Sequence, residues 1–164
     1  MATMKSEKKP PSEQINSSSL LDMSQSSVKK MMAQAKARAV SADSPGALVI
    51  GADQILDCEG RSYDKPVGEE EVRSHLTSLR GRAHRLISAV CVAEAGEICW
   101  SHTAVGTLTM RNFDDTYLEH YIHQAGPEIQ LSVGAYRLEG IGVQLFERIE
   151  GDYFTILGLP LLPL

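Results

Sequence analysis

The stretch Leu-Val-Ile-Gly-Ala-Asp-Gln-Ile-Leu at residues 48–56 is the part of the chain that most strongly determines the fold. It is an aliphatic run typical of a buried strand, and it delivers Asp53 and Gln54 just after Gly51. A carboxylate among apolar residues is costly to desolvate unless a cation, a hydrogen-bond donor or open water meets it. Asp53 is therefore either a side chain that a rigid strand holds in a cleft or a residue that caps a turn at the strand end. The local sequence leaves both interpretations open.

Upstream of this strand, the sequence predicts a helix over residues 28–40 that ends at Ser44-Pro45-Gly46. The helical period places the larger apolar side chains and two alanines on one face, namely Val28, Met31, Met32, Ala35 and Ala39. The first 27 residues, rich in lysine, proline and serine, are typical of a disordered tail. We therefore expect one domain over residues 28–164, preceded by a divergent tail over residues 1–27.

Downstream of the strand, helices and strands continue to alternate. The acidic run at residues 69–71 favours a helix N-terminus and predicts a helix that ends near Leu79. Residues 84–93 and 97–110 predict a β-hairpin, and residues 114–124 predict a further helix. This order predicts an α/β fold with a mixed sheet.

Composition limits the classes of partner. The 164 residues carry a formal charge of −5, which argues against sequence-independent binding to nucleic acid or to an anionic membrane. A nucleotide is still compatible with this charge, because carboxylates can recruit a divalent cation that meets the phosphates. The three cysteines include no Cys-x-x-Cys pair, and no apolar run approaches the ~20 residues of a membrane span. We expect a soluble cytoplasmic protein.

Several polar residues beside glycine, proline or apolar runs are candidates for chemistry. A phosphate-bearing substrate needs lysines as point charges and a carboxylate that holds Mg²⁺ or orients a water molecule. For each candidate a structural interpretation also stands: Lys36 on a solvated helix face, Lys65 in a loop, and Asp152 at the start of a turn. The candidates are Asp53, Lys36, Lys65, Glu139 and Asp152.

Other common sites have little support in the sequence. His120 and His123 are spaced to bracket a cation on one helix, but no further ligand is evident and we expect them at the surface. Ser88 and the cysteines show no nucleophile–base pattern. The glycines at residues 134–142 have neither the Rossmann nor the Walker spacing.

Six ordered segments resemble one family. They are Ile-Gly-Ala-Asp-Gln at 50–54, Asp-Lys-Pro at 64–66, Leu-x-x-Leu-x-Gly-x-x-His at 76–84, Val-Gly-Ala-Tyr at 133–136, Leu-Glu-Gly at 138–140, and Glu-Gly-Asp-Tyr-x-x-Ile-x-Gly-Leu-Pro at 150–160. In this order they resemble the Maf family of nucleoside triphosphate pyrophosphatases, and the resemblance covers about residues 33–164. It implies a Maf/ITPase-like fold, a twisted mixed sheet flanked by helices with a nucleotide cleft.

The resemblance also implies an activity, namely hydrolysis of a nucleoside triphosphate to the monophosphate and diphosphate with a divalent metal cation, Mg²⁺, Mn²⁺ or Co²⁺. On this mapping Asp53 is the catalytic carboxylate and the metal ligand, and Lys36 and Lys65 face the phosphates. Gln54 and Glu139 resemble the pair of the subgroup that acts on 7-methyl-GTP. A carboxylate can accept hydrogen bonds from the N1–H and N2 amine of a guanine edge, which a pyrimidine lacks. A homodimer is compatible with the resemblance.

One segment departs from the family pattern. The family begins with a strand and a Ser-x-Ser-x-x-Arg loop that binds phosphate, and the first 30 residues here contain no arginine. We therefore expect the N-terminal strand to be absent. Two hypotheses follow: an active nucleotide pyrophosphatase with substitute phosphate contacts, or a catalytically impaired Maf-like remnant that binds nucleotide weakly or acts through a partner.

Overall fold

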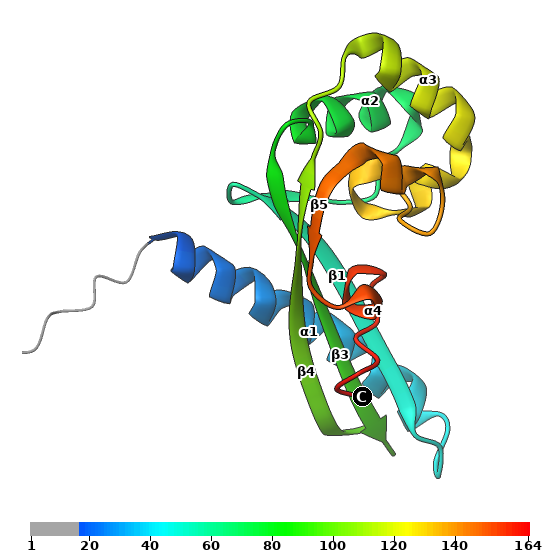
Figure 1. The fold of residues 1–164 in the computed structure, drawn as a ribbon. Coiled ribbons are helices and arrows are strands. Elements are labelled where there is room, and N and C mark those ends of the chain that lie inside the picture. Colours follow the sequence, from blue (N-terminus) through cyan, green and yellow to red (C-terminus); the bar gives the residue numbers. More distant parts are fainter. Residues whose placement is uncertain (1–16) are drawn as a thin grey trace, which may run out of the picture.

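The computed structural model describes residues 17–164, with side chains from residue 26 onward. Its centre is a twisted five-stranded sheet of order β2-β1-β3-β4-β5 (Figure 1). The strands are β1 (Val49–Cys58), β2 (Arg61–Tyr63), β3 (Ala83–Glu94), β4 (Glu97–Met110) and β5 (Phe146–Glu150). The predicted α/β class is confirmed, and the 97–110 hairpin strand has the predicted bounds.

The described sheet is antiparallel at all of its pairings, whereas the sequence predicted a mixed sheet. The connections explain this difference. Two-residue turns join β1 to β2 and β3 to β4, and such turns produce antiparallel neighbours, because a parallel pair needs a crossover of about a dozen residues.

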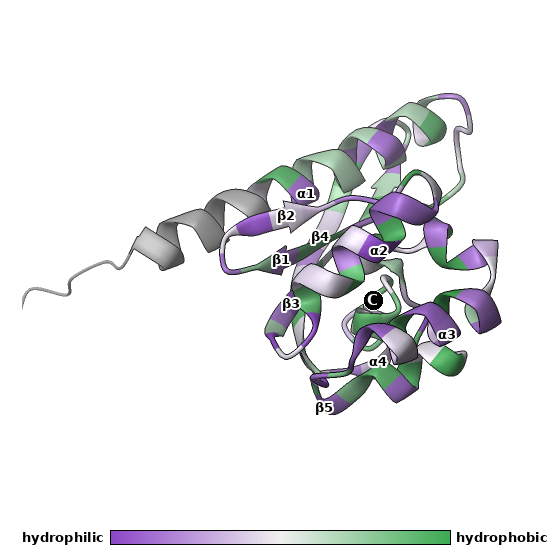
Figure 2. Cartoon of the chain, turned by 90° about the horizontal axis from the view of Figure 1, so that it is seen from above, coloured by the Kyte–Doolittle hydropathy of each residue, from purple (hydrophilic) through white to green (hydrophobic). Residues whose placement is uncertain are grey.

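Helices lie on both faces of the sheet, as Figure 2 shows from above. The long helix α1 (Ser17–Ala42) packs across β1, β3 and β4 on one face. The helices α2 (Gly68–Leu79), α3 (Asp115–Ala125) and α4 (Tyr153–Ile156), with three 3₁₀ helices, lie on the other side. The 3₁₀ helices are η1 (Pro127–Leu131), η2 (Val133–Ala135) and η3 (Ile141–Leu145). No described helix is long and apolar enough to cross a bilayer.

The main core lies between the sheet and the helices α2 and α3. Leu56, Leu86 and Leu108 point from three adjacent strands into this core and are almost completely buried. The amphipathic helix α2 contributes Val72, Leu76 and Leu79. Tyr136 and Phe146 pack edge to face at 4.8 Å between ring centroids and close the core beside η2.

The face that α1 buries differs from the predicted one. From residue 26 onward its buried residues are Lys29, Ala33, Ala37 and Ser41, a single row spaced by four. Met31 is 68% exposed, and the rest of the predicted apolar face is exposed as well. The reason is the close approach of α1 to β1 at Gly51, where a Cβ would lie 2.5 Å from the Ala33 carbonyl oxygen. Only small residues fit at that distance, so hydrophobic size did not predict the contact.

The N-terminal expectations are partly overturned. Residues 1–16 of the predicted tail lie outside the described residues, but residues 17–27 belong to α1 and are helical. Within residues 17–164, β1 is the first strand, and β2 pairs only with its last three residues. On the side of β1 that faces away from β3, residues 49–55 therefore have no partner strand in the described part of the chain.

Candidate functional site

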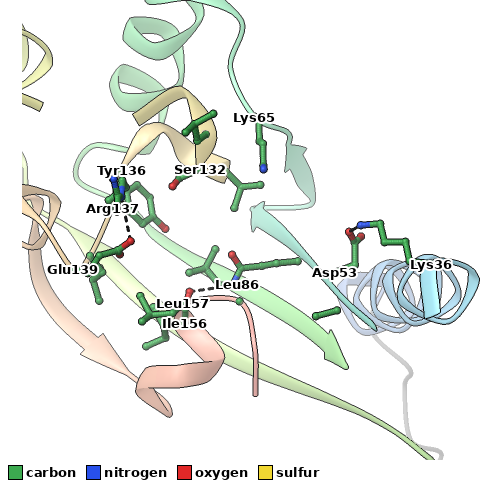
Figure 3. A pocket seen from close by; sticks show the side chains of 16 residues that line it. Lys36, Asp53, Lys65, Leu86, Ser132, Tyr136, Arg137, Glu139, Ile156 and Leu157 are labelled. Atoms are coloured by element: carbon green, nitrogen blue, oxygen red, sulfur yellow. Dashed lines mark hydrogen bonds and ion pairs between the residues drawn. The ribbon is translucent and has the colours of Figure 1, made fainter. Parts of the chain in front are cut away.

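A pocket of about 340 Å³ brings the sequence-predicted site residues together beside the free edge of β1 (Figure 3). Lys36 comes from α1, Asp53 and Gln54 come from β1, Lys65 follows β2, and Glu139 lies on the loop after η2. All five line this one pocket although up to 103 positions of sequence separate them (36 to 139). Asp152 does not line it.

Asp53 is held between two lysines of α1. The Lys36 ammonium lies 2.5 Å from Asp53 Oδ1, and the Lys29 ammonium lies 3.1 Å from Oδ2. The Lys29 and Asp53 side chains are only 10% and 12% exposed, so both charges are largely removed from water. Lys29 contacts Oδ2 as an ion pair without hydrogen-bonding geometry. Asp53 lies within β1 rather than at its end, so the turn-cap interpretation is wrong.

Sequence reasoning did not identify Lys29. The signal that could have found it is its spacing of seven residues from Lys36, which places both lysines on one side of a helix. The carboxylate that joins them is supplied by a strand and could not be assigned to this helix from local sequence.

Gln54 points to the opposite face of the sheet from Asp53, as consecutive strand residues do. Its Nε2 donates to Ser88 Oγ at 2.8 Å and to the carbonyl oxygens of Thr155 and Ile156 at 3.2 and 3.0 Å. Ser88 Oγ in turn donates to the Thr155 carbonyl at 2.7 Å. Gln54 therefore connects α4 to the sheet through its amide N–H donors, and its Oε1 oxygen takes part in none of these hydrogen bonds.

Asp152 has the structural role that the sequence analysis left open. Its carboxylate accepts the Thr155 backbone N–H at 2.8 Å and the Thr155 hydroxyl at 3.0 Å, so it caps the N-terminus of α4. This cap and Gln54 together fix the segment whose Ile156, Leu157 and Gly158 form one side of the pocket.

Lys65 and Arg137 supply further positive charge to the pocket lining. Lys65 is exposed, and only Asp64 lies between it and the end of β2. Arg137 was not predicted, and it donates from Nε to Glu139 Oε1 at 3.1 Å and from Nη1 to Glu128 Oε2. The sequence signal was its position two residues before Glu139 in a glycine-rich segment.

The floor of the pocket includes Tyr136, whose hydroxyl lies 2.7 Å from Nε2 of the buried His84. Burial lowers the pKa of His84 to about 4 and raises the pKa of Tyr136, so both side chains are neutral near pH 7. The other ring nitrogen, Nδ1, has no hydrogen-bond partner.

The pocket lining therefore combines the shielded carboxylate of Asp53 with cationic side chains from three separate segments, of which Arg137 is paired with Glu139 and Glu128. Cationic groups from separate segments around one pocket suit an extended polyanion better than a single anion. No group of three His, Cys, Asp or Glu side chains that could hold a metal ion occurs among residues that the structure describes. A metal would need ligands from a bound polyanion as well as from Asp53, which is the usual arrangement for Mg²⁺ with phosphates.

Comparison with known proteins supports one family. The model of the Maf-like protein family matches residues 3–164. This match begins 30 residues before the resemblance seen in the sequence (33 − 3), so the family model also includes most of the segment that we expected to be divergent.

Three relatives illustrate the similarity. A nucleoside triphosphate pyrophosphatase of Paramagnetospirillum magneticum is 54% identical over 137 residues, which are 84% of this chain and 71% of the relative. A nucleoside triphosphate pyrophosphatase of Nitrobacter winogradskyi is 51% identical over 79% of this chain and 64% of the relative. A 7-methyl-GTP pyrophosphatase of Mesorhizobium japonicum is 47% identical over 82% of this chain and 67% of the relative. The chain thus spans about two thirds of the length of these relatives. With nearly its whole length matched by the family model, the chain belongs to the Maf family.

Proposed function

We propose that the chain is a nucleoside triphosphate pyrophosphatase, which cleaves the α–β anhydride with water to give the nucleoside monophosphate and diphosphate. The observation that carries this proposal is the shielded Asp53 at the edge of a pocket whose lining also holds Lys36, Lys65 and Arg137. The relatives named nucleoside triphosphate pyrophosphatase support the same activity.

In this mechanism Asp53 positions the attacking water and accepts its proton as the P–O bond forms. The oxygen that leaves with the diphosphate develops negative charge, and Lys36 and Lys65 stabilise that charge on the two sides of the pocket. Lys29 holds the second carboxylate oxygen, so the orientation of Asp53 is set before substrate binds.

Asp53 is the pocket carboxylate that would hold a divalent cation. Such a cation would neutralise the charge of the triphosphate.

For the base, we propose 7-methyl-guanine. Gln54 spends its two N–H donors on Ser88 and α4, so it can offer the pocket only an acceptor oxygen, and Glu139 also offers acceptors. Two acceptors match the N1–H and N2 amine of guanine. Methylation at N7 adds a positive charge to the purine, which a carboxylate attracts. The relative of Mesorhizobium japonicum named 7-methyl-GTP pyrophosphatase supports this choice.

The test is release of diphosphate from 7-methyl-GTP, GTP and UTP with Mg²⁺ or Mn²⁺. The Asp53→Asn variant, which keeps the shape of the side chain, should lose about 10²–10⁴-fold in rate. Asp43→Asn, a change at an exposed residue outside the pocket, is the matched control and should keep the wild-type rate. Wild-type release no faster than that of Asp53→Asn would overturn the proposal and leave the chain as a nucleotide-binding remnant.

A further inference from the structure

Arg137 lies in a wall between two cavities. The first is the nucleotide pocket of about 340 Å³, and the second has a volume of about 270 Å³ and is lined by residues of α3, η1 and η3. Arg137 and Glu139 line both cavities, whereas Glu128 lines only the second. A substitution of Glu128 therefore replaces no residue that lines the first pocket.

Arg137 bridges two segments that are otherwise separate in sequence. It donates from Nε to Glu139 Oε1 at 3.1 Å, as the dashed line in Figure 3 shows. It also donates from Nη1 to Oε2 of Glu128, which belongs to η1. The guanidinium is planar, so hydrogen bonds from two of its nitrogens fix both the plane and the direction of the group. Arg137 is thus held by Glu128 and in turn restricts the carboxylate of Glu139.

The charges of this group favour one kind of base edge. Two carboxylates and one guanidinium leave one net negative charge at the wall. Arg137 occupies Oε1 of Glu139, so Oε2 is the oxygen that can accept from a ligand. A guanine edge offers adjacent N–H donors to such an oxygen, but uracil places carbonyl oxygens on both sides of its single N–H. A carboxylate fixed in direction discriminates between these edges better than one free to rotate.

We propose that Glu128, Arg137 and Glu139 form one base-selecting unit, in which Arg137 positions Glu139 and Glu128 positions Arg137. This proposal rests on the proposed function of the pocket, because it assumes that a nucleotide base lies against Glu139. It adds Arg137 and Glu128 to the residues that determine specificity, and it assigns this role to a residue outside the nucleotide pocket.

Binding of nucleoside monophosphates tests the unit without the need for catalysis. Calorimetry would measure the dissociation constants of 7-methyl-GMP, GMP and UMP for the wild type, Arg137→Met and Glu128→Gln. We expect Arg137→Met to weaken the binding of both purine nucleotides about tenfold or more. The dissociation constant of UMP should change by less than about twofold. Glu128→Gln should act in the same direction by a smaller factor, because it removes a charge that lies outside the pocket.

Arg148→Met is the matched control. Arg148 donates to Glu150 Oε1 at 2.8 Å, so it has the same spacing of two residues as Arg137 and Glu139, but this ion pair is on the exposed face of β5. The control should leave all three dissociation constants unchanged. Thermal unfolding of each variant would show that the folded state is retained, and Arg137→Lys should restore part of the purine preference because it returns one donor and the charge.

Two results would overturn the proposal. Equal weakening of purine and pyrimidine nucleotides by Arg137→Met would mean that Arg137 contributes only charge. A purine-to-pyrimidine ratio unaffected by Glu128→Gln would mean that no unit exists. Failure of the proposed function is separate, since it would show as no diphosphate release from any triphosphate even where the wild type still discriminates between the monophosphates.

Discussion

Asp53 is the residue on which most of the site's charge converges. Two ammonium groups face its two oxygens, and the side chain is 12% exposed. A largely buried ion pair gains little net stability over an apolar pair, but loss of one partner leaves the other charge uncompensated. Because Lys36 would still pair with Asp53 in the absence of Lys29, the cost of losing Lys29 should be lower than for an isolated pair.

The first prediction concerns Lys29→Met, which keeps the length of the side chain and removes its charge. We expect the free energy of unfolding to fall by about 1–3 kcal/mol, measured by urea denaturation. The matched control is Lys30→Met at the next, exposed position of α1, which should stay within about 0.5 kcal/mol of the wild type. If both variants unfold at the same urea concentration as the wild type, Lys29 does not stabilise the folded Asp53.

At the scale of elements, the contact between α1 and the sheet determines whether Lys36 reaches Asp53. A hypothetical Cβ at Gly51 would lie 2.5 Å from the Ala33 carbonyl oxygen and 2.8 Å from the Ala37 Cβ. The neighbours are a helix backbone and a methyl group, so neither can rotate away. Gly51 has no left-handed φ, and its requirement is for space alone.

The second prediction is that Gly51→Ala moves α1 away from β1. We expect a loss of about 1–3 kcal/mol in the free energy of unfolding, and faster hydrogen exchange of α1 amides than in the wild type. Gly140→Ala is the control, because its Cβ would meet only the Arg137 carbonyl oxygen at an ordinary 3.8 Å. A stable Gly51→Ala variant with unchanged protection of α1 would contradict the tight contact seen here.

The sequence predicted most elements and failed where small residues and distant partners decide the structure. The helix from Gly68 to Leu79 and the hairpin at Ala95-Gly96 were found because periodicity and turn residues are local signals. The buried face of α1 was predicted wrongly, because the contact selects alanine and glycine for their size and leaves Met31 exposed.

The candidate site was predicted only in part, and the reason is similar. Asp53 and Glu139 stand in recognisable motifs, but Lys29, Arg137 and Glu128 matter through contacts that the chain makes only when folded. Gln54 illustrates the limit: its position was predicted, yet its donors are occupied by Ser88 and α4 rather than free for a ligand.

For the whole molecule, the third prediction is that stability falls as the pH is lowered below 7, owing largely to His84. Burial lowers the pKa of His84 from 6.5 to about 4, so between these values the unfolded chain binds more protons and the free energy of unfolding decreases with falling pH. The decrease from pH 7 to pH 5 should be about 2 kcal/mol from this residue, measured by urea denaturation. His84→Gln should remove most of this slope. Some slope should remain, because burial also lowers the pKa of His75. His120→Gln, at an exposed position of α3, should keep the wild-type slope, and equal slopes for all three proteins would show that His84 is not buried as a neutral imidazole.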